Sequence, residues 1–174
     1  DERRRFAQVS HEYLIEQVQH DTISGTGDTT KTLHFNHPVK ELIWSSVPSA
    51  LASSVSTGDG ATDNHARAPI GPINGNWQLK LNGRDRFKAR DYRYFTRTQV
   101  WEHHTGHGGI FGRDSSTAKS KDFIGVYSFA LKPEEHQPAG TCNFSRIDNA
   151  QLVGTADALA TRVYAVNYNV LRIM

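Results

Sequence analysis

Three histidines in the stretch EHHTGHGG, His103, His104 and His107, are the residues best suited to hold a metal ion. Imidazole is a common metal ligand, and a cupin-like metal enzyme would use such a group. Neighbouring residues of a strand point to opposite faces, so 103 and 104 could share one ion only if the strand had ended. His34 and His37 have the same parity problem. The spacing favours surface histidines and predicts no metal site, and a metal enzyme remains the less favoured alternative.

The stretch KPEEHQPAGTCNFSRIDNA carries the other candidate catalytic groups. Carboxylates that cleave a glycosidic bond lie on opposite sides of it, whereas Glu134 and Glu135 are adjacent and follow a proline, which favours a solvated turn. Cys142 would need a base to become a nucleophile, and only His136 could fold back to supply one. No nucleophile-elbow, phosphate-loop or dinucleotide motif occurs. We therefore predict no catalytic residue and no cofactor.

Asn143, Phe144 and Ser145 form an N-glycosylation triplet, a pattern that also occurs often by chance. The chain opens on charged residues, with no apolar signal stretch, so we expect no secretory glycosylation. Its single cysteine forms no internal disulfide.

Charge gives little support for nucleic-acid binding, since the formal net charge is only +2. Bases could stack on the aromatic rings of RFKARDYRYF, but Asp85 and Asp91 interrupt its basic residues, which favours salt-bridged packing at a junction. The basic cluster at 3–5 is short and follows two acids, so it is expected to be solvated. No apolar run approaches eighteen residues, which predicts no membrane insertion. In RFKARDYRYF, the basic residues that Asp85 and Asp91 interrupt are Arg86, Lys88, Arg90 and Arg93.

Apolar residues alternate with polar ones along most of the chain, which is typical of β-strands. In WQLKL, for example, Trp77, Leu79 and Leu81 share one face. Helical patterns are weak, so we expect little helix. The final segment has one apolar face, formed by Tyr164, Val166, Tyr168 and Val170. Its other face holds Val163, Ala165, Asn167, Asn169, Leu171 and Ile173, which is consistent with contacts on both sides. The eight predicted strands are 11–19, 31–36, 40–46, 76–82, 92–102, 123–131, 150–156 and 162–173.

The connections between these strands favour an antiparallel sandwich. Asn82-Gly83 is a strong tight-turn dipeptide, because both residues tolerate positive φ. Two long connections, 48–75 and 103–122, are rich in small and polar residues. Eight short strands without a helical layer predict an all-β fold, with a single eight-stranded antiparallel jelly-roll domain over 1–174 as the favoured arrangement. In that arrangement the two long loops emerge at the same end; they join the third strand to the fourth (the D–E loop) and the fifth to the sixth (the F–G loop).

The chain ends inside an apolar run, and its only methionine is Met174. Both features lead us to expect a piece of a longer protein. Three stretches then carry a family resemblance. LKLNGRDRFKARDYRYF (79–95), YSFALKPEEHQPAGTCNFSRIDNA (127–150) and YAVNYNVLRIM (164–174) resemble segments of the major capsid protein of nucleocytoplasmic large DNA viruses, the group of phycodnaviruses, iridoviruses and mimivirus-like agents. The opening RRFAQVSHEYLIEQVQ is similar to the start of the second half of such proteins.

The resemblance implies a structural virion protein and no enzyme. This chain would be the second barrel of a double jelly roll whose N-terminal sister barrel is absent from it. Homotrimers would form pseudo-hexameric capsomers of an icosahedral shell that assembles in the host cytoplasm. The implied partners are further copies, the sister barrel and minor capsid proteins, with no direct contact to nucleic acid.

Two further expectations concern surface residues. Arg146 and Asp148 are two apart, so they could point to one side and bridge to an adjacent subunit. The alternative from another functional class is a carbohydrate-binding jelly-roll module that would use loop aromatics. Those aromatics are Trp77, Trp101 and Phe111.

Overall fold

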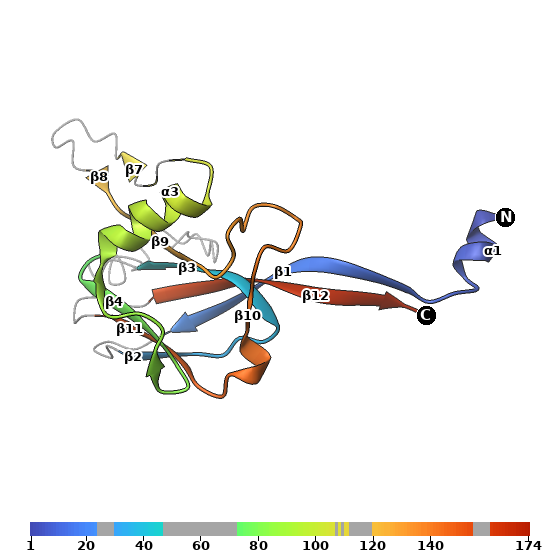
Figure 1. Ribbon diagram of the computed structural model, residues 1–174, viewed down its shortest axis with the longest axis horizontal. Coiled ribbons are helices and arrows are strands. Elements are labelled where there is room, and N and C mark those ends of the chain that lie inside the picture. The colour runs from blue at the N-terminus through green and yellow to red at the C-terminus, as the bar shows by residue number, and fades with distance from the viewer. Residues whose placement is uncertain (24–29, 47–72, 107, 109, 112–119, 155–160) are drawn as a thin grey trace, which may run out of the picture.

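The computed structural model describes residues 1–23, 30–46, 73–106, 108, 110–111, 120–154 and 161–174 (Figure 1). It is built around two antiparallel β-sheets whose buried faces form one shared core. Most of the two long connections predicted at 48–75 and 103–122 lies outside the described residues.

The first sheet has the order β1-β12-β3, and both β9 and the short β10 pair with β3. Thirteen residue pairs join β1 to β12, from His11 opposite Ile173 to Ile23 opposite Thr161. Its strands are β1 (His11–Ile23), β3 (Pro38–Ser46), β9 (Ile124–Ser128), β10 (Cys142–Asn143) and β12 (Thr161–Ile173).

The second sheet has the order β2-β11-β4, with two short strands that pair along β4. Its strands are β2 (Thr30–Leu33), β4 (Asn76–Leu81), β5 (Arg84–Asp85), β6 (Arg90–Asp91) and β11 (Ala150–Gly154). A separate pair joins β7 (Ile110–Phe111) to β8 (Ser120–Lys121). Successive long strands alternate between the two main sheets, and this confirms the antiparallel jelly roll. The described strands are more numerous and more fragmented than the eight predicted.

The strand predicted at 92–102 is wrong. A π-helical turn, η1 (Tyr94–Thr98), continues into the helix α3 (Gln99–His103), and the two lie beside β9. The buried positions there are Phe95, Thr96 and Gln99, with Val100 half-buried, which is a helical spacing rather than an alternating one. The Gln99 side-chain oxygen accepts a hydrogen bond from the Ser128 N–H of β9 at 3.1 Å. Tertiary contacts of this kind decided between two interpretations of one aromatic-rich stretch.

Two other helical pieces are short: α1 (Glu2–Phe6) and the 3-10 turn η2 (Phe144–Arg146). Within the described residues, no helix has the length and apolar character needed to cross a bilayer.

Asn82 and Gly83 have φ angles of 51° and 76°, and they close the hairpin in which Leu81 pairs with Arg84. The predicted tight turn is confirmed. The Asn82 side-chain oxygen also accepts the N–H groups of Asp148 and Asn149 at 2.9 and 3.1 Å. The hairpin is therefore fastened to the segment that leads into β11.

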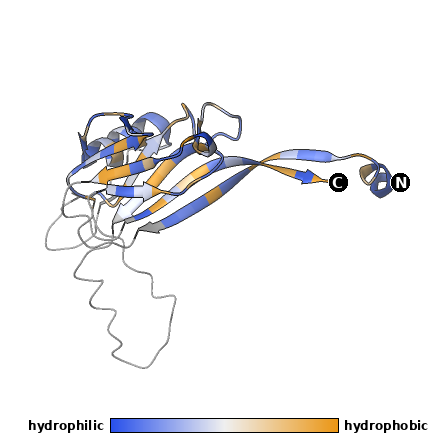
Figure 2. Cartoon of the chain, turned by 90° about the horizontal axis from the view of Figure 1, so that it is seen from below, coloured by the Kyte–Doolittle hydropathy of each residue, from blue (hydrophilic) through white to orange (hydrophobic). Residues whose placement is uncertain are grey.

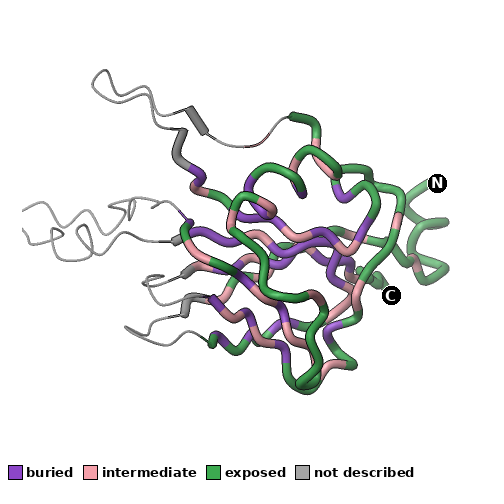
Figure 3. The backbone as a smooth tube through the Cα atoms, turned by 60° about the vertical axis from the view of Figure 1, so that its left-hand side comes forward, coloured by how far each residue is buried: buried purple, intermediate pink, exposed green. Residues whose placement is uncertain are grey.

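The core lies between the sheets and centres on Trp44 from β3 and Trp77 from β4, whose ring centroids are 5.9 Å apart. Each indole packs over a glycine on the neighbouring strand. A Cβ at Gly125 would lie 2.6 Å from the Trp44 ring, and one at Gly154 would lie 2.7 Å from Trp77. The predicted alternation is confirmed in β4, where the side chains of Trp77 and Leu79 are buried. Figure 3 shows the buried segments gathered within the two sheets.

Candidate assembly surface

One half of the β1–β12 pair projects beyond the sandwich as a two-stranded ribbon, with both chain termini near its tip (Figure 1). We call residues 11–18 and 166–173 the ribbon; at its base, residues 166 and 167 also pair with β3. Opposed residues of an antiparallel pair share a face. The face that buries Val163 and Ala165 inside the sandwich continues along the ribbon as Tyr13 opposite Leu171. Their exposed fractions are 46% and 47%, so this face loses its cover where the sandwich ends.

The opposite face of the ribbon also carries two apolar pairs. Leu14 pairs with Val170, and Val18 pairs with Val166. Val18 and Val170 are 63% and 57% exposed. Figure 2 shows hydrophobic residues on the ribbon well away from the body of the molecule. Both faces expose apolar residues beside polar ones such as Glu12 and Arg172, which form an ion pair at 3.5 Å. This mixture suits an interface better than a solvated hairpin.

β1 is also an edge strand, since β12 is its only partner in the sheet among the described residues. Its outer row of backbone N–H and C=O groups faces away from the sheet over thirteen residues. Long edge strands invite pairing with other chains unless something covers them. The ribbon therefore combines exposed side chains with an unpaired backbone edge.

A charged contact fixes the base of the ribbon to the body. The Lys40 ammonium is buried and donates to Glu16 of β1 at 2.7 Å. It also lies 5.0 Å from the centroid of the Tyr168 ring. The hydrogen bond from Lys40 lowers the pKa of the Glu16 carboxyl below its ordinary value of 4.5, although burial opposes the shift. Strand β3 takes an irregular step here, since Val166 pairs with Glu41 but the next residue pairs with Val39.

The tip of the ribbon carries α1, whose residues are all exposed. Its three arginines, Arg3 to Arg5, are followed by Phe6, which stacks on the His11 ring with centroids 3.9 Å apart. This agrees with the solvated lead-in predicted for the basic cluster.

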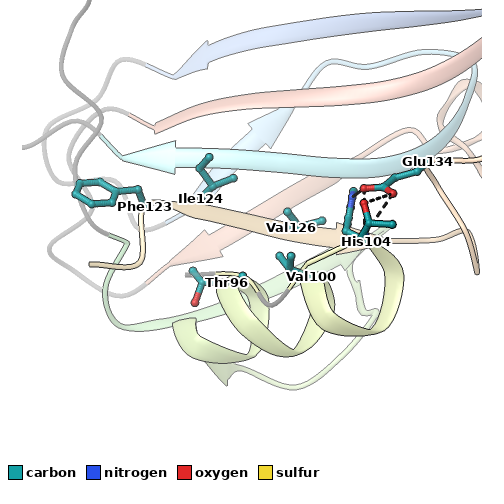
Figure 4. Close-up of a pocket in the computed structure, with 9 residues that line it drawn as sticks. Thr96, Val100, His104, Phe123, Ile124, Val126 and Glu134 are labelled. Carbon is teal, nitrogen blue, oxygen red and sulfur yellow. Dashed lines mark hydrogen bonds and ion pairs between the residues drawn. The ribbon is translucent and has the colours of Figure 1, made fainter. Parts of the chain in front are cut away.

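A second surface lies where α3 meets the first sheet. A cavity of about 310 Å³ opens between α3 and β9, with apolar walls from Val100, Ile124 and Val126 (Figure 4). One end is polar and contains the His104 ring and the Glu134 carboxylate. His104 Nε2 lies 2.8 Å from Glu41 of β3, and its Nδ1 lies 3.0 Å from Glu134.

The histidines considered as metal ligands have other partners. His103 and His104 are at the end of α3 rather than on a strand, so the parity argument used for them does not apply. His103 Nδ1 lies 3.0 Å from the backbone oxygen of Leu131. No group of three His, Cys, Asp or Glu side chains among the described residues is arranged to hold a metal ion. His107 lies outside that part of the chain.

The other catalytic candidates are separated. Glu134 binds His104 and Thr105, whereas Glu135 forms an exposed ion pair with Lys132 at 2.9 Å. Burial raises the pKa of the half-buried Cys142 thiol, and this opposes nucleophilic reactivity. His136 points instead toward Glu16, at 3.5 Å.

The Asn-X-Ser triplet has a local structural role. The Asn143 side-chain oxygen accepts the Ser145 N–H at 3.0 Å, and this caps the turn η2. The Ser145 hydroxyl oxygen accepts the N–H of His37 at 2.9 Å.

Arg146 and Asp148 are both exposed, but they do not lie on a strand. Arg146 ends η2, and the Asp148 N–H donates to Asn82. Within the part of the chain that the structure describes, no ion pair joins their side chains, so both are open to an external partner. The predicted interface role stays a prediction.

The aromatic residues proposed for carbohydrate binding do not form one surface. Trp77 is fully buried and its indole N–H donates to the Asn74 oxygen at 3.0 Å, so it cannot stack on a sugar. Trp101 is 71% exposed on α3. The side chain of Phe111 lies outside the described residues.

The basic and aromatic stretch that ends at residue 95 folds on itself. The Arg90 guanidinium lies 4.4 Å from the Tyr94 ring centroid. Arg93 lies 5.3 Å from the Tyr92 ring and contacts Asp91. These contacts agree with packing rather than with a base-stacking surface.

Comparison with known proteins agrees with the sequence resemblance. The family model for the large eukaryotic DNA virus major capsid protein matches residues 2–174. A major capsid protein of Pyramimonas orientalis virus is 46% identical over 191 residues, which include 100% of this chain and 43% of the relative. That of Paramecium bursaria Chlorella virus 1 is 35% identical over 229 residues, covering 99% of this chain and 49% of the relative.

Solved structures give the same result. The chain matches the PBCV-1 virus capsid quasi-atomic model with a TM-score of 0.66 and 31% identity, over 99% of this chain and 52% of that chain. The Faustovirus major capsid protein, at 12% identity and a TM-score of 0.62, shares the fold. The chain spans about half the length of the curated relatives it matches.

Proposed function

The chain belongs to the large eukaryotic DNA virus major capsid protein family, and we propose that it is the second barrel of a double jelly-roll protein of the virion shell. Its role is structural and not catalytic. Three copies of the complete protein form a pseudo-hexameric capsomer, and capsomers tile an icosahedral capsid that assembles in the host cytoplasm. The expected partners are other copies, the sister barrel and minor capsid proteins.

The observation that carries this proposal is the apolar ribbon of a chain that spans about half of its relatives. A two-stranded ribbon is only marginally stable in water, and this one exposes apolar residues on both faces. Packing against the sister barrel would cover those faces and the edge of β1. The N-terminus lies beside the ribbon tip, so the C-terminal end of a preceding barrel would lie next to the surface that it covers (Figure 1).

Weak contacts repeated through a symmetric assembly suit the rest of the surface. A shell needs many modest contacts rather than one tight one, since their free energies add over the symmetric copies. Exposed single residues such as Trp101 and Leu131 are available for such contacts.

The proposal is tested by expression of the full-length reading frame, followed by light scattering and negative-stain microscopy. We expect trimers with a hexagonal outline, and we expect the second barrel of each copy to fit the present fold. A full-length protein that stays monomeric under assembly conditions, or that lacks a preceding β-rich domain, would contradict it.

The interface role of Arg146 has its own test in the same assay. The charge reversal Arg146→Glu should impair the formation of trimers or shells, while the far-ultraviolet circular dichroism of the sheets stays unchanged. Trimers that form and assemble as in the unmodified protein would exclude this role. The exposed ion-pair residue Lys132 offers a matched reversal on another part of the surface.

A further inference from the structure

Residues 131–141 form an exposed excursion between the end of β9 and β10, which we call the flap. Pro133 is its only buried residue, and Ala139 is half-buried. The Leu131 N–H donates to the Ala139 oxygen at 3.2 Å, so the flap closes on itself. With so little apolar burial, its opening costs far less free energy than unfolding of the sandwich.

Histidines supply much of the polar contact between the flap and the body. His103 of α3 lies 3.0 Å from the Leu131 oxygen at the start of the flap. His136, on the flap itself, lies 3.5 Å from Glu16 of β1. Imidazole is the side chain whose charge changes nearest to neutral pH, which directs attention to His104, the histidine that contacts two carboxylates.

His104 makes the central contact, and its geometry defines its protonation state. One ring nitrogen faces Glu41 at 2.8 Å. The other faces Glu134 of the flap at 3.0 Å, and this contact is drawn in Figure 4. A neutral imidazole has one N–H, whereas two ionised carboxylates need two donors. His104 is therefore the imidazolium in this arrangement. The hydrogen bond with Glu41 is the main reason that the pKa of His104 rises above its ordinary value of 6.5, although burial opposes the rise.

Loss of one ring proton affects the two carboxylates unequally. The Glu41 side chain is 8% exposed and the Glu134 side chain is 42% exposed. A buried carboxylate without a donor is costly, whereas an exposed one exchanges its partner for water. The remaining N–H therefore stays with Glu41, and the lone pair on Nδ1 then faces the Glu134 carboxylate. Glu134 keeps only its bonds from Thr105, at 3.2 Å from the N–H and 2.9 Å from the hydroxyl.

No other described charge replaces the lost contact. The β9 residues beside the ring, Ile124 and Val126, are uncharged. Lys40, next to Glu41 in sequence, is directed to Glu16. The only charged groups that face His104 are Glu41 from β3 and Glu134 from the flap, within the part of the chain that the structure describes.

We propose that His104 is a proton-operated latch, which holds the flap against α3 and β3 when both ring nitrogens carry a proton and releases it when one is lost. The sandwich remains folded in both states. The raised pKa of His104 places the release on the alkaline side: the latch is complete below 6.5 and is lost as the pH rises through the raised pKa. On the acid side, bonds from Thr105 and His104 lower the pKa of Glu134, so the contact survives until the pH falls through a value below 4.5.

Amide hydrogen exchange of the full-length protein between about pH 6 and 10, a window that spans the titration of a histidine with a raised pKa, tests the latch. The rates are corrected for intrinsic exchange. We expect the protection of flap amides to fall by up to about tenfold per pH unit above the midpoint, the limit for release of one proton. Amides of β12 should keep their protection. The midpoint should coincide with the midpoint of the His104 ring titration, followed through the ring carbon chemical shift by nuclear magnetic resonance in the unmodified protein.

Two variants sharpen the test. His104→Gln keeps a donor for Glu41 but cannot titrate, so the step in flap exchange should vanish. His34→Gln is the matched control, because His34 is exposed and faces a single carboxylate, Asp21, at 3.1 Å. In this variant the fall in flap protection with pH should be the same as in the unmodified protein. A step that persists in His104→Gln, or flap protection that stays flat while the His104 ring titrates, would overturn the proposal. If His104→Gln does not fold, the unmodified protein still tests the proposal, through the comparison of flap protection with the titration of the His104 ring.

Discussion

The two halves of the β1–β12 pair obey one sequence pattern and have opposite environments. Inside the sandwich, Val163 and Ala165 of β12 are fully buried against the second sheet. On the ribbon, Leu171 and Ile173 lie on the same face of the same strand and are 47% and 40% exposed. The hydrogen-bond register between β1 and β12 continues without interruption from one region to the other. The difference therefore comes from what lies above the strands and not from the strands.

This comparison separates two uses of apolar alternation. In the body, the apolar side chains of the inward face are covered within the described chain, by the second sheet and the indoles of Trp44 and Trp77. On the ribbon, apolar side chains on both faces stay exposed among the described residues. Exposed apolar surface of this kind favours association with another domain. The same chemistry thus stabilises a fold in one region and prepares an interface in the other.

The largest effect is expected for Trp44→Ala in the core. Removal of this buried indole should lower the free energy of unfolding by about 3–5 kcal/mol, since the cavity cannot fully collapse. The matched change is Trp101→Ala on α3, which is 71% exposed and should cost less than about 0.5 kcal/mol. Urea denaturation followed by circular dichroism measures both. Similar costs for the two variants would contradict the assignment of Trp44 to the core.

Gly125→Ala tests the packing of the core from the opposite direction. The new Cβ would lie 2.6 Å from the Trp44 ring, so the indole must shift. We expect destabilisation by about 1–3 kcal/mol, the usual cost of overpacking. The substitution Ile124→Ala at the neighbouring exposed position serves as control, and thermal unfolding of both proteins gives the comparison. If the Gly125→Ala variant is as stable as the original protein, this contact is not tight.

Glu16→Gln tests the junction between the body and the ribbon. The substitution leaves the buried Lys40 ammonium without its carboxylate partner. We expect the free energy of unfolding to fall by about 1–3 kcal/mol, toward the lower end because Glu16 is partly exposed. The pKa of Glu16 is lowered in the fold. Its contribution is therefore present above pH 4.5 and is lost as the pH falls through the folded value. The stability difference between the two proteins should shrink in that acid range, and a difference independent of pH would contradict the pairing.

The smallest effect, and the most informative about the ribbon, is expected for Val18→Thr combined with Val170→Thr. Threonine keeps the β-branched shape but adds a hydroxyl, which costs about 1 kcal/mol or more where it is buried without a partner. In the full-length protein this pair should therefore lower the melting temperature, although both valines are more than half exposed here. Ile124→Thr, which is 41% exposed on the body, should be nearly neutral. A neutral result for the ribbon pair would mean that nothing covers its outer face.

Sequence reasoning succeeded where one local rule decided the structure. Alternation predicted the strand that holds Trp77 and Leu79. The dipeptide Asn82-Gly83 predicted the turn after it, because positive φ at both residues leaves few other conformations. It failed at 92–102, where aromatic and polar residues suit either period. The Gln99 contact to Ser128, which favours the helix, joins residues that are 29 apart in sequence.

The surface residues were harder to predict than the fold. Arg146 and Asp148 were selected for a strand spacing that the chain does not adopt there, whereas Val18 and Lys40 were not singled out at all. A lysine in the stretch PVKELIW gives no local signal that it will be buried against Glu16. The contacts of His104 with Glu41 and Glu134 span 63 and 30 residues, so spacing could not reveal them.

The amino-acid sequence by itself determined the antiparallel strands, the tight turn and the family resemblance, because each depends on residues that are close together along the chain. Only the tertiary structure decided which apolar faces are buried, that 94–103 is helical, and that one imidazole lies between two carboxylates. Those outcomes depend on which distant segments meet, and on where the second sheet ends and leaves the ribbon uncovered.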